Sequence, residues 1–239
     1  MSVDPRNRLI VALDVPGLAE AEALLDRLAG LVSTFKIGAQ LFTAAGPAAV
    51  ELCRKRGGRV FLDLKYHDIP ATVSGAVREA ARLGVTLLTV HASGGSAMLR
   101  AAAAAAGEAG RDRPRILAVT VLTSLDRAAL QRELQVPVAV EGQVVHLAAL
   151  AREAGCDGAV ASPQEARRLR MAMGSGWLIV TPGIRPAGAE VGDQARVATP
   201  EAARRAGADY LVVGRPITGA PDPAAAAAAI VAELERAAR

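Results

Sequence analysis

The chain has 239 residues, 51% of them apolar, enough to bury the core of one α/β barrel or of two small domains. Its net charge is +4, but the arginines are scattered along the chain rather than collected in one block. Aromatic residues make up only 3% of the chain, so base-stacking platforms are few and nucleic-acid binding is not expected.

The apolar run after the N-terminal charges is too short for a signal-peptide core or a membrane span. The two cysteines, Cys53 and Cys156, match no disulfide or zinc-ligand spacing. We therefore expect a cytoplasmic protein without a membrane anchor and without a structural metal.

Short runs rich in Val, Ile, Leu and Thr alternate with Ala-rich segments of helical spacing, a pattern typical of βα units around a parallel sheet. Eight strands are predicted, at residues 9–13, 34–37, 60–64, 87–90, 116–120, 158–161, 178–181 and 210–213. Helices are predicted between them, including 18–29, 71–83, 97–106 and 163–173.

Eight βα units in a chain of this length match a (β/α)8 TIM barrel. The alternative is an open doubly wound sheet, but no GxGxxG follows the first strand. No linker rich in Pro, Gly or Ser divides the chain, so we expect residues 1–239 to form a single domain.

Charged residues lie at or just after the ends of the first three predicted strands, where such a barrel builds its active site. These residues are Asp14, Lys36, Asp63, Lys65 and Asp68. Side chains alternate along a strand, so Asp63 and Lys65 share one face, which must point into the barrel because helices cover the outside. Salt bridges that merely close the barrel end are the alternative. A catalytic site is favoured because only three of the 28 cationic residues are lysine, a residue suited to proton transfer.

The residues that follow the last two predicted strands are of types that can bind a phosphate group. Gly183 and Arg185 follow the seventh strand, and Gly214 and Arg215 end the eighth. Glycine lets the backbone approach a ligand closely, and arginine offers two parallel donors to phosphate oxygens. The loop from Pro186 to about residue 196, which contains Gln194, is long enough for a lid over the site, although a plain surface loop is an equal alternative.

Residues 61–72 read FLDLKYHDIPAT and contain the pattern Asp-x-Lys-x-x-Asp-Ile-x-x-Thr. By this pattern the chain resembles the orotidine 5′-phosphate decarboxylase family. The resemblance continues in order through residues 12–14, 35–38, 90–95, 119–124, 180–185, 193–200 and 212–218, and so covers nearly the whole chain.

The resemblance implies decarboxylation of orotidine 5′-phosphate to UMP and CO2 without cofactor or metal, with Lys65 protonating C6 of the pyrimidine. It implies a homodimer with shared active sites, in which Asp68 and Thr72 come from the neighbouring subunit. The remaining implied roles are a charged network of Lys36 and Asp63 with Lys65 and Asp68, ribose contacts by Asp14, Lys36 and Thr72, a pyrimidine contact by Thr123 or Ser124, and phosphate contacts by Arg185, Gln194, Gly214 and Arg215.

Two alternatives remain open. A magnesium-dependent keto-gulonate phosphate decarboxylase or hexulose phosphate synthase shares the Asp-x-Lys-x-x-Asp pattern, but those relatives place an acid on the second strand, where this chain has Lys36, and a lysine does not bind magnesium. The second alternative is a noncatalytic protein that binds a nucleotide or a sugar phosphate. Such a protein would keep the phosphate-binding residues Arg185, Gln194 and Arg215 but would not need the charged residues Lys36, Asp63, Lys65 and Asp68.

Overall fold

A computed structural model describes residues 5–186 and 198–237 of the chain. Its strands are β1 (Leu9–Ala12), β2 (Thr34–Gly38), β3 (Arg59–Tyr66), β4 (Leu87–His91), β5 (Arg115–Val119), β6 (Gly158–Val160), β7 (Leu178–Thr181) and β8 (Tyr210–Val213). Each is parallel to its neighbours, and β1 pairs with β8 to close the barrel. The predicted (β/α)8 fold is confirmed.

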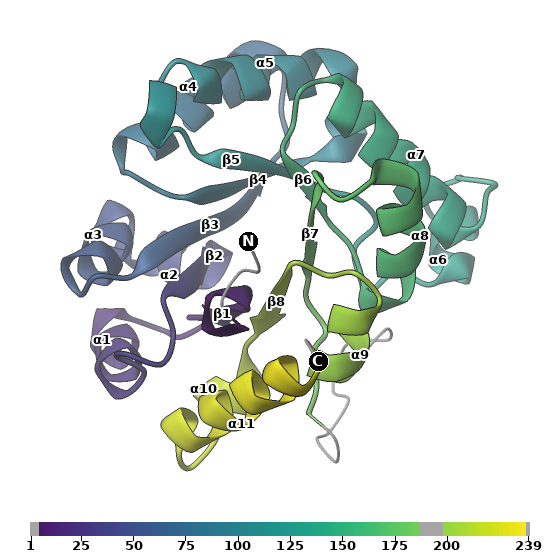
Figure 1. Cartoon of the computed structure of the whole chain (residues 1–239). Coiled ribbons are helices and arrows are strands. Elements are labelled where there is room, and N and C mark those ends of the chain that lie inside the picture. Colours follow the sequence, from purple (N-terminus) through teal and green to yellow (C-terminus); the bar gives the residue numbers. More distant parts are fainter. Residues whose placement is uncertain (1–4, 187–197, 238–239) are drawn as a thin grey trace.

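Helices surround the strands on the outside (Figure 1). The α-helices are α1 (Leu18–Arg27), α2 (Ala39–Ala45), α3 (Pro47–Lys55), α4 (Pro70–Arg82), α5 (Gly95–Gly107), α6 (Arg127–Arg132), α7 (Val140–Glu153), α8 (Pro163–Met173), α9 (Pro200–Arg205), α10 (Arg215–Thr218) and α11 (Pro223–Arg236). Short 3-10 helices are η1 (Pro5–Arg8), η2 (Ala92–Gly94) and η3 (Gly110–Asp112). Within the described residues, no helix combines the length and apolarity that a membrane span requires.

Strand β1 is apolar on both faces because both faces are buried. In β1, Leu9 and Val11 belong to the large core between the sheet and the helices, whereas Ile10 and Ala12 belong to a smaller core inside the barrel. The interior core also contains Phe61, Leu87, Leu117, Val180 and Val212. This packing fills the barrel, so polar side chains gather at the ends of the strands, and the site is expected at the carboxyl ends.

Two aspartates tie the strands together at the opposite, amino-terminal end. Asp157, just before β6, accepts hydrogen bonds from the Ile116 N–H (2.8 Å) and from both terminal nitrogens of Arg113 (2.9 and 2.6 Å). Asp209, just before β8, is bound in a similar way by Arg170 (2.6 Å). Each carboxylate accepts hydrogen bonds from an arginine at the amino-terminal end of the barrel. These bonds stabilise this face of the fold.

Strand β3 differs from its prediction in a way that matters for the site. It runs to Tyr66, two residues beyond the predicted end. Its pairing with β4 shifts register between Leu62 and Tyr66, and Lys65 in this interval has φ of 51°, in the left-handed region. Such a conformation costs a residue other than glycine about 1–2 kcal/mol, so the surrounding structure must hold Lys65 in place.

Candidate active site

A cavity of about 470 Å³ opens at the carboxyl ends of the strands. This size suits a small organic ligand such as a nucleotide. Eight of the residues predicted for the site line it: Asp14, Lys36, Asp63, Lys65, Thr123, Arg185, Gly214 and Arg215. Side chains from opposite ends of the sequence therefore meet here because the barrel closes β1 against β8.

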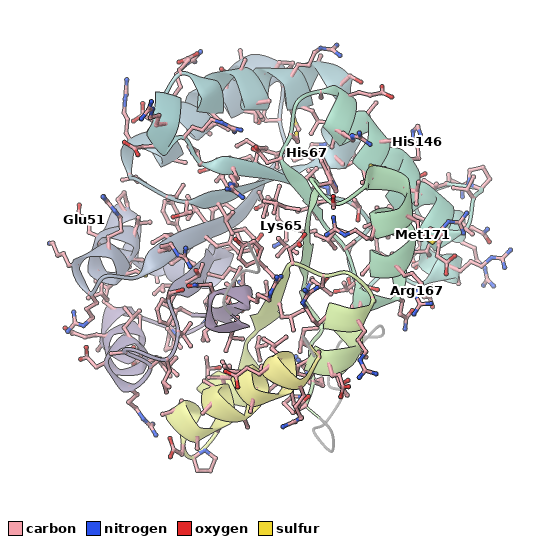
Figure 2. All side chains as sticks on the ribbon, in the orientation of Figure 1. Glu51, Lys65, His67, His146, Arg167 and Met171 are labelled. Atoms are coloured by element: carbon pink, nitrogen blue, oxygen red, sulfur yellow. The ribbon has the colours of Figure 1, made fainter. Side chains whose placement is uncertain are left out.

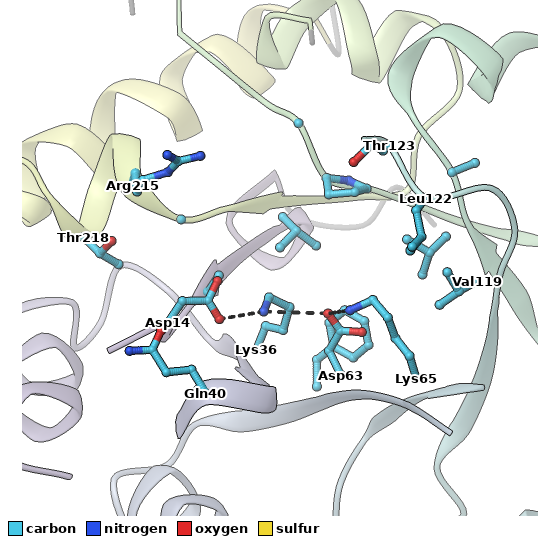
Figure 3. Close-up of a pocket in the computed structure, with 18 of the residues that line it drawn as sticks. Asp14, Lys36, Gln40, Asp63, Lys65, Val119, Leu122, Thr123, Arg215 and Thr218 are labelled. Carbon is cyan, nitrogen blue, oxygen red and sulfur yellow. Dashed lines mark hydrogen bonds and ion pairs between the residues drawn. The ribbon is translucent and has the colours of Figure 1, made fainter. Parts of the chain in front are cut away.

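Four of these residues form a chain of alternating charge (Figure 3). Lys36 Nζ lies 2.9 Å from Asp14 Oδ1 and 3.7 Å from Asp63 Oδ2, and Lys65 Nζ lies 2.9 Å from the same Asp63 oxygen. The side chains of Lys36 and Asp63 are only 11% and 12% exposed, whereas that of Lys65 is 38% exposed. Each buried charge thus has a partner of opposite sign. Of the two lysines, Lys65 has the more exposed side chain, and Figure 2 shows Lys65 within the ring of strands.

Thr89 on β4 connects this charged chain to the irregular part of β3. Its side-chain oxygen accepts a hydrogen bond from the Lys65 N–H (2.9 Å) and donates one to Asp63 Oδ1 (2.9 Å). Sequence reasoning did not single out Thr89. Threonine is common in strands, and only the register of β3 against β4 shows that its hydroxyl faces Asp63.

Gly38, the last residue of β2, leaves room for the ion pair between Asp14 and Lys36. A Cβ atom at this position would lie 2.8 Å from Asp14 Oδ1 and 2.9 Å from Lys36 Nζ. Glycine is therefore favoured here for space and not for backbone conformation, since a φ of −95° is open to any residue. It too was missing from the sequence prediction.

The arginines and glycines after β7 and β8 also line the cavity. Figure 3 shows Arg215 well away from Lys65, with Asp14 and Lys36 between them. Arg185 is buried, and its N–H donates to the Ala198 carbonyl (2.9 Å), while the Ala198 N–H donates to Gly183 (3.2 Å). These bonds join the two ends of the predicted lid loop. The loop itself, with Gln194, lies outside the described residues.

Three predicted residues do not line the cavity of their own chain. Asp68 is exposed, and its Oδ1 accepts a hydrogen bond from the Ile69 N–H (2.6 Å). Thr72 is exposed on the first turn of α4, and Ser124 follows Thr123, which does line the cavity. The cross-subunit roles of Asp68 and Thr72 stay predictions. Gln40 and Thr218 line the cavity without having been predicted.

His91 ends β4 beside this site. Burial lowers its pKa below the ordinary value, and the neighbouring charges of His67 and Lys65 act in the same direction. The two imidazole rings stack with centroids 5.2 Å apart, and Ser93 Oγ lies 3.2 Å from His91 Nδ1. The lowered pKa favours the neutral form of the His91 ring beside the Lys65 ammonium.

The fold is a (β/α)8 barrel, and lysine, aspartate and arginine side chains line one cavity at the carboxyl ends of its strands, the arrangement expected of a barrel enzyme. The family model for the orotidine 5′-phosphate decarboxylase / HUMPS family matches residues 7–230. The chain belongs to this family.

Similar proteins agree with this assignment. An orotidine 5′-phosphate decarboxylase from Moorella thermoacetica is 60% identical over 96% of this chain and 93% of its own length. Another from Halorhodospira halophila is 56% identical over 98% of each chain. The crystal structure of orotidine 5′-phosphate decarboxylase from Lactobacillus acidophilus superposes with a TM-score of 0.85 at 39% identity, covering 95% of this chain and 99% of that one.

Proposed function

We propose that the chain converts orotidine 5′-phosphate to UMP and CO2, the step that yields UMP in pyrimidine synthesis, with Lys65 as the proton donor to C6. Relatives at 60% and 56% identity over nearly the full length are named for this reaction. The observation that carries the role of Lys65 is its ammonium group, held 2.9 Å from Asp63 at the cavity wall.

The chemistry requires positive charge beside the reacting carbon. When the bond between C6 and the carboxylate breaks, its electron pair stays at C6, and CO2 leaves. A preorganised ammonium stabilises this developing charge, then transfers a proton to C6 and regains one from solvent. Lys65 can perform both steps without a metal or an organic cofactor, so we propose that none takes part.

The other charged residues orient Lys65 and the substrate. Asp63 holds the Lys65 ammonium by a direct ion pair, and Lys36 balances the charge of Asp63 from the other side. In this proposal Asp14 and Lys36 bind the ribose hydroxyls, which fits their place between Lys65 and Arg215 (Figure 3). Thr123 is favoured over Ser124 as the pyrimidine contact because it lines the cavity.

Phosphate binding belongs to the opposite end of the cavity. The proposal assigns the phosphate to Arg185, Gly214 and Arg215, with Gln194 from the loop between β7 and α9. Two guanidinium groups supply charge-assisted donors, and a glycine lets a backbone N–H reach an oxygen. Binding energy gained here, far from C6, can organise the closed site for the reaction.

A homodimer completes the site in this proposal, with Asp68 and Thr72 reaching the cavity of the partner subunit. Both residues are exposed in the single chain, and Ile69 beside them is 66% exposed, an apolar side chain that a subunit contact would bury. Mixing Lys65→Ala with Asp68→Asn, each inactive alone, should restore activity in mixed dimers. No recovery in verified mixed dimers would refute the shared site.

The family model also covers the HUMPS branch, so the magnesium-dependent sugar-phosphate enzymes are the competing function. Lys36 argues against them. It lies on β2 and pairs with Asp14 and Asp63, at a place where a magnesium ion would need oxygen ligands.

The two free, buried cysteines suit a reducing cytoplasm, where we propose the enzyme works.

The reaction is tested by incubating chelator-treated protein with orotidine 5′-phosphate and identifying the product by chromatography. The proposal expects UMP and CO2 in equal amounts at an undiminished rate. Turnover that depends on added magnesium, or conversion of a sugar phosphate in place of the nucleotide, would favour the competing branch of the family.

A further inference from the structure

We propose that Thr89 is a positioning residue for the decarboxylation, acting through Asp63 and Lys65 without touching the substrate. This inference rests on the proposed function of Lys65. Thr89 lies in the middle of β4 and is fully buried. Its side chain contacts the two residues of β3 that carry the reaction in the proposal.

The hydroxyl of Thr89 uses both of its hydrogen-bonding capacities. Its single proton goes to Asp63 Oδ1, and its oxygen accepts the Lys65 N–H, each at 2.9 Å. Asp63 Oδ1 is thereby occupied, and the other oxygen, Oδ2, faces Lys65 Nζ at 2.9 Å and Lys36 Nζ at 3.7 Å. The carboxylate has distinct partners on its two oxygens, so its rotation is restricted and the Lys65 ammonium has one defined anchor.

The same hydroxyl compensates for the broken ladder between β3 and β4. The strands pair at Phe61 with Leu87 and at Leu62 with Leu88, and pairing resumes only at Tyr66 with Val90. Lys65 falls in the gap with a left-handed backbone. Its N–H finds an acceptor in the Thr89 side chain, which helps to hold a conformation that would otherwise relax.

Loss of the hydroxyl should therefore affect the chemical step more than substrate binding. Valine at position 89 has the shape of threonine but leaves the Lys65 N–H and one Asp63 oxygen without their partner. The Lys65 ammonium would lose its fixed position relative to C6, and misplacement of a catalytic group by about 1 Å can cost roughly 100-fold in rate. Among the described residues, the hydrogen bonds of Thr89 go to Lys65 and Asp63 and not to the residues proposed to bind ribose and phosphate, so KM should change little.

The experiment compares Thr89→Val with Thr89→Ser, which retains the hydroxyl, and with Thr181→Val as a matched control. Thr181 is a fully buried threonine at the end of β7 whose hydroxyl has no hydrogen-bond partner among the described residues. We expect kcat to fall about 10- to 100-fold in Thr89→Val with KM within about threefold. Thr89→Ser should recover most of the rate, and Thr181→Val should retain it.

Circular dichroism and thermal unfolding show whether each variant is folded. If Thr89→Val does not fold, Thr89→Cys takes its place, because a thiol has similar size but bonds weakly. Equal kcat in folded Thr89→Val and wild type, or equal losses in the serine and valine variants, would overturn the proposal. Absence of turnover in the wild type would instead overturn the proposed function, on which the role of Thr89 depends.

Discussion

Replacement of Gly38 by alanine should damage activity while leaving the fold intact. The new Cβ atom would lie 2.8 Å from Asp14 Oδ1 and 2.9 Å from Lys36 Nζ, whereas ordinary contacts begin at 3.4 Å. The two charged groups must therefore retreat by roughly half an ångström or more. Because both are ends of flexible side chains, they can do so without moving the backbone, but they leave the positions proposed for ribose binding.

The expected loss in kcat/KM for Gly38→Ala is about 10- to 100-fold, equivalent to about 1.4–2.7 kcal/mol of transition-state stabilisation. The free energy of unfolding should change by less than about 1 kcal/mol, since alanine accepts a φ of −95° and restricts the unfolded chain. Steady-state decarboxylation and urea unfolding measure the two effects.

Gly142→Ala on α7 is the matched control, because a Cβ atom there meets nothing within 4 Å. It should keep full activity and gain up to about 1 kcal/mol of stability from better helix propensity. Unchanged kcat/KM in Gly38→Ala, or a loss of activity that merely follows a loss of folded protein, would refute the steric argument.

Two further predictions concern the fold rather than the chemistry. Burial raises the pKa of the Cys53 thiol to about 12, and burial together with the Asp157 charge raises that of Cys156 to about 12. A thiol reagent at pH 8 should therefore modify neither cysteine until urea unfolds the chain. Rapid modification of the native protein would contradict this prediction. Asp157→Ala should lower the free energy of unfolding by about 2–3 kcal/mol and Asp157→Asn by less, because alanine leaves the Ile116 N–H and Arg113 without their acceptor. Equal urea midpoints for the three proteins would exclude that role.

The barrel itself could be predicted from sequence because its signals are local. Each strand is a short apolar run bounded by helices, and β7 and β8 lie at the predicted residues. Strand β3 extends past its predicted end because the chain bends through Lys65 and pairs again at Tyr66. The regular alternation of side chains along a strand still predicts Asp63 and Lys65 on the inner face. Nothing in the local sequence indicates that Lys65, between two paired segments of β3, has a left-handed backbone.

The charged part of the site could also be predicted, since strand ends of a barrel converge and lysine is rare in this chain. Thr89 and Gly38 could not, because their roles depend on register and distance between neighbouring strands. A threonine in a strand and a glycine before a helix are ordinary features of any barrel. Gln40 and Thr218 were missed for a similar reason, since each sits on a helix turn that only the folded chain brings to the cavity.

The proton-donor role of Lys65 is the central claim, and the three lysines of the chain allow a direct test. Chelator-treated wild type, Lys65→Ala and Lys55→Ala are compared by the loss of orotate absorbance from orotidine 5′-phosphate. Lys55 is a suitable control because its side chain is 77% exposed on α3 and pairs only with Glu51 among the described residues. The account predicts full turnover in wild type and Lys55→Ala and none above background in folded Lys65→Ala; substantial turnover in Lys65→Ala would contradict it.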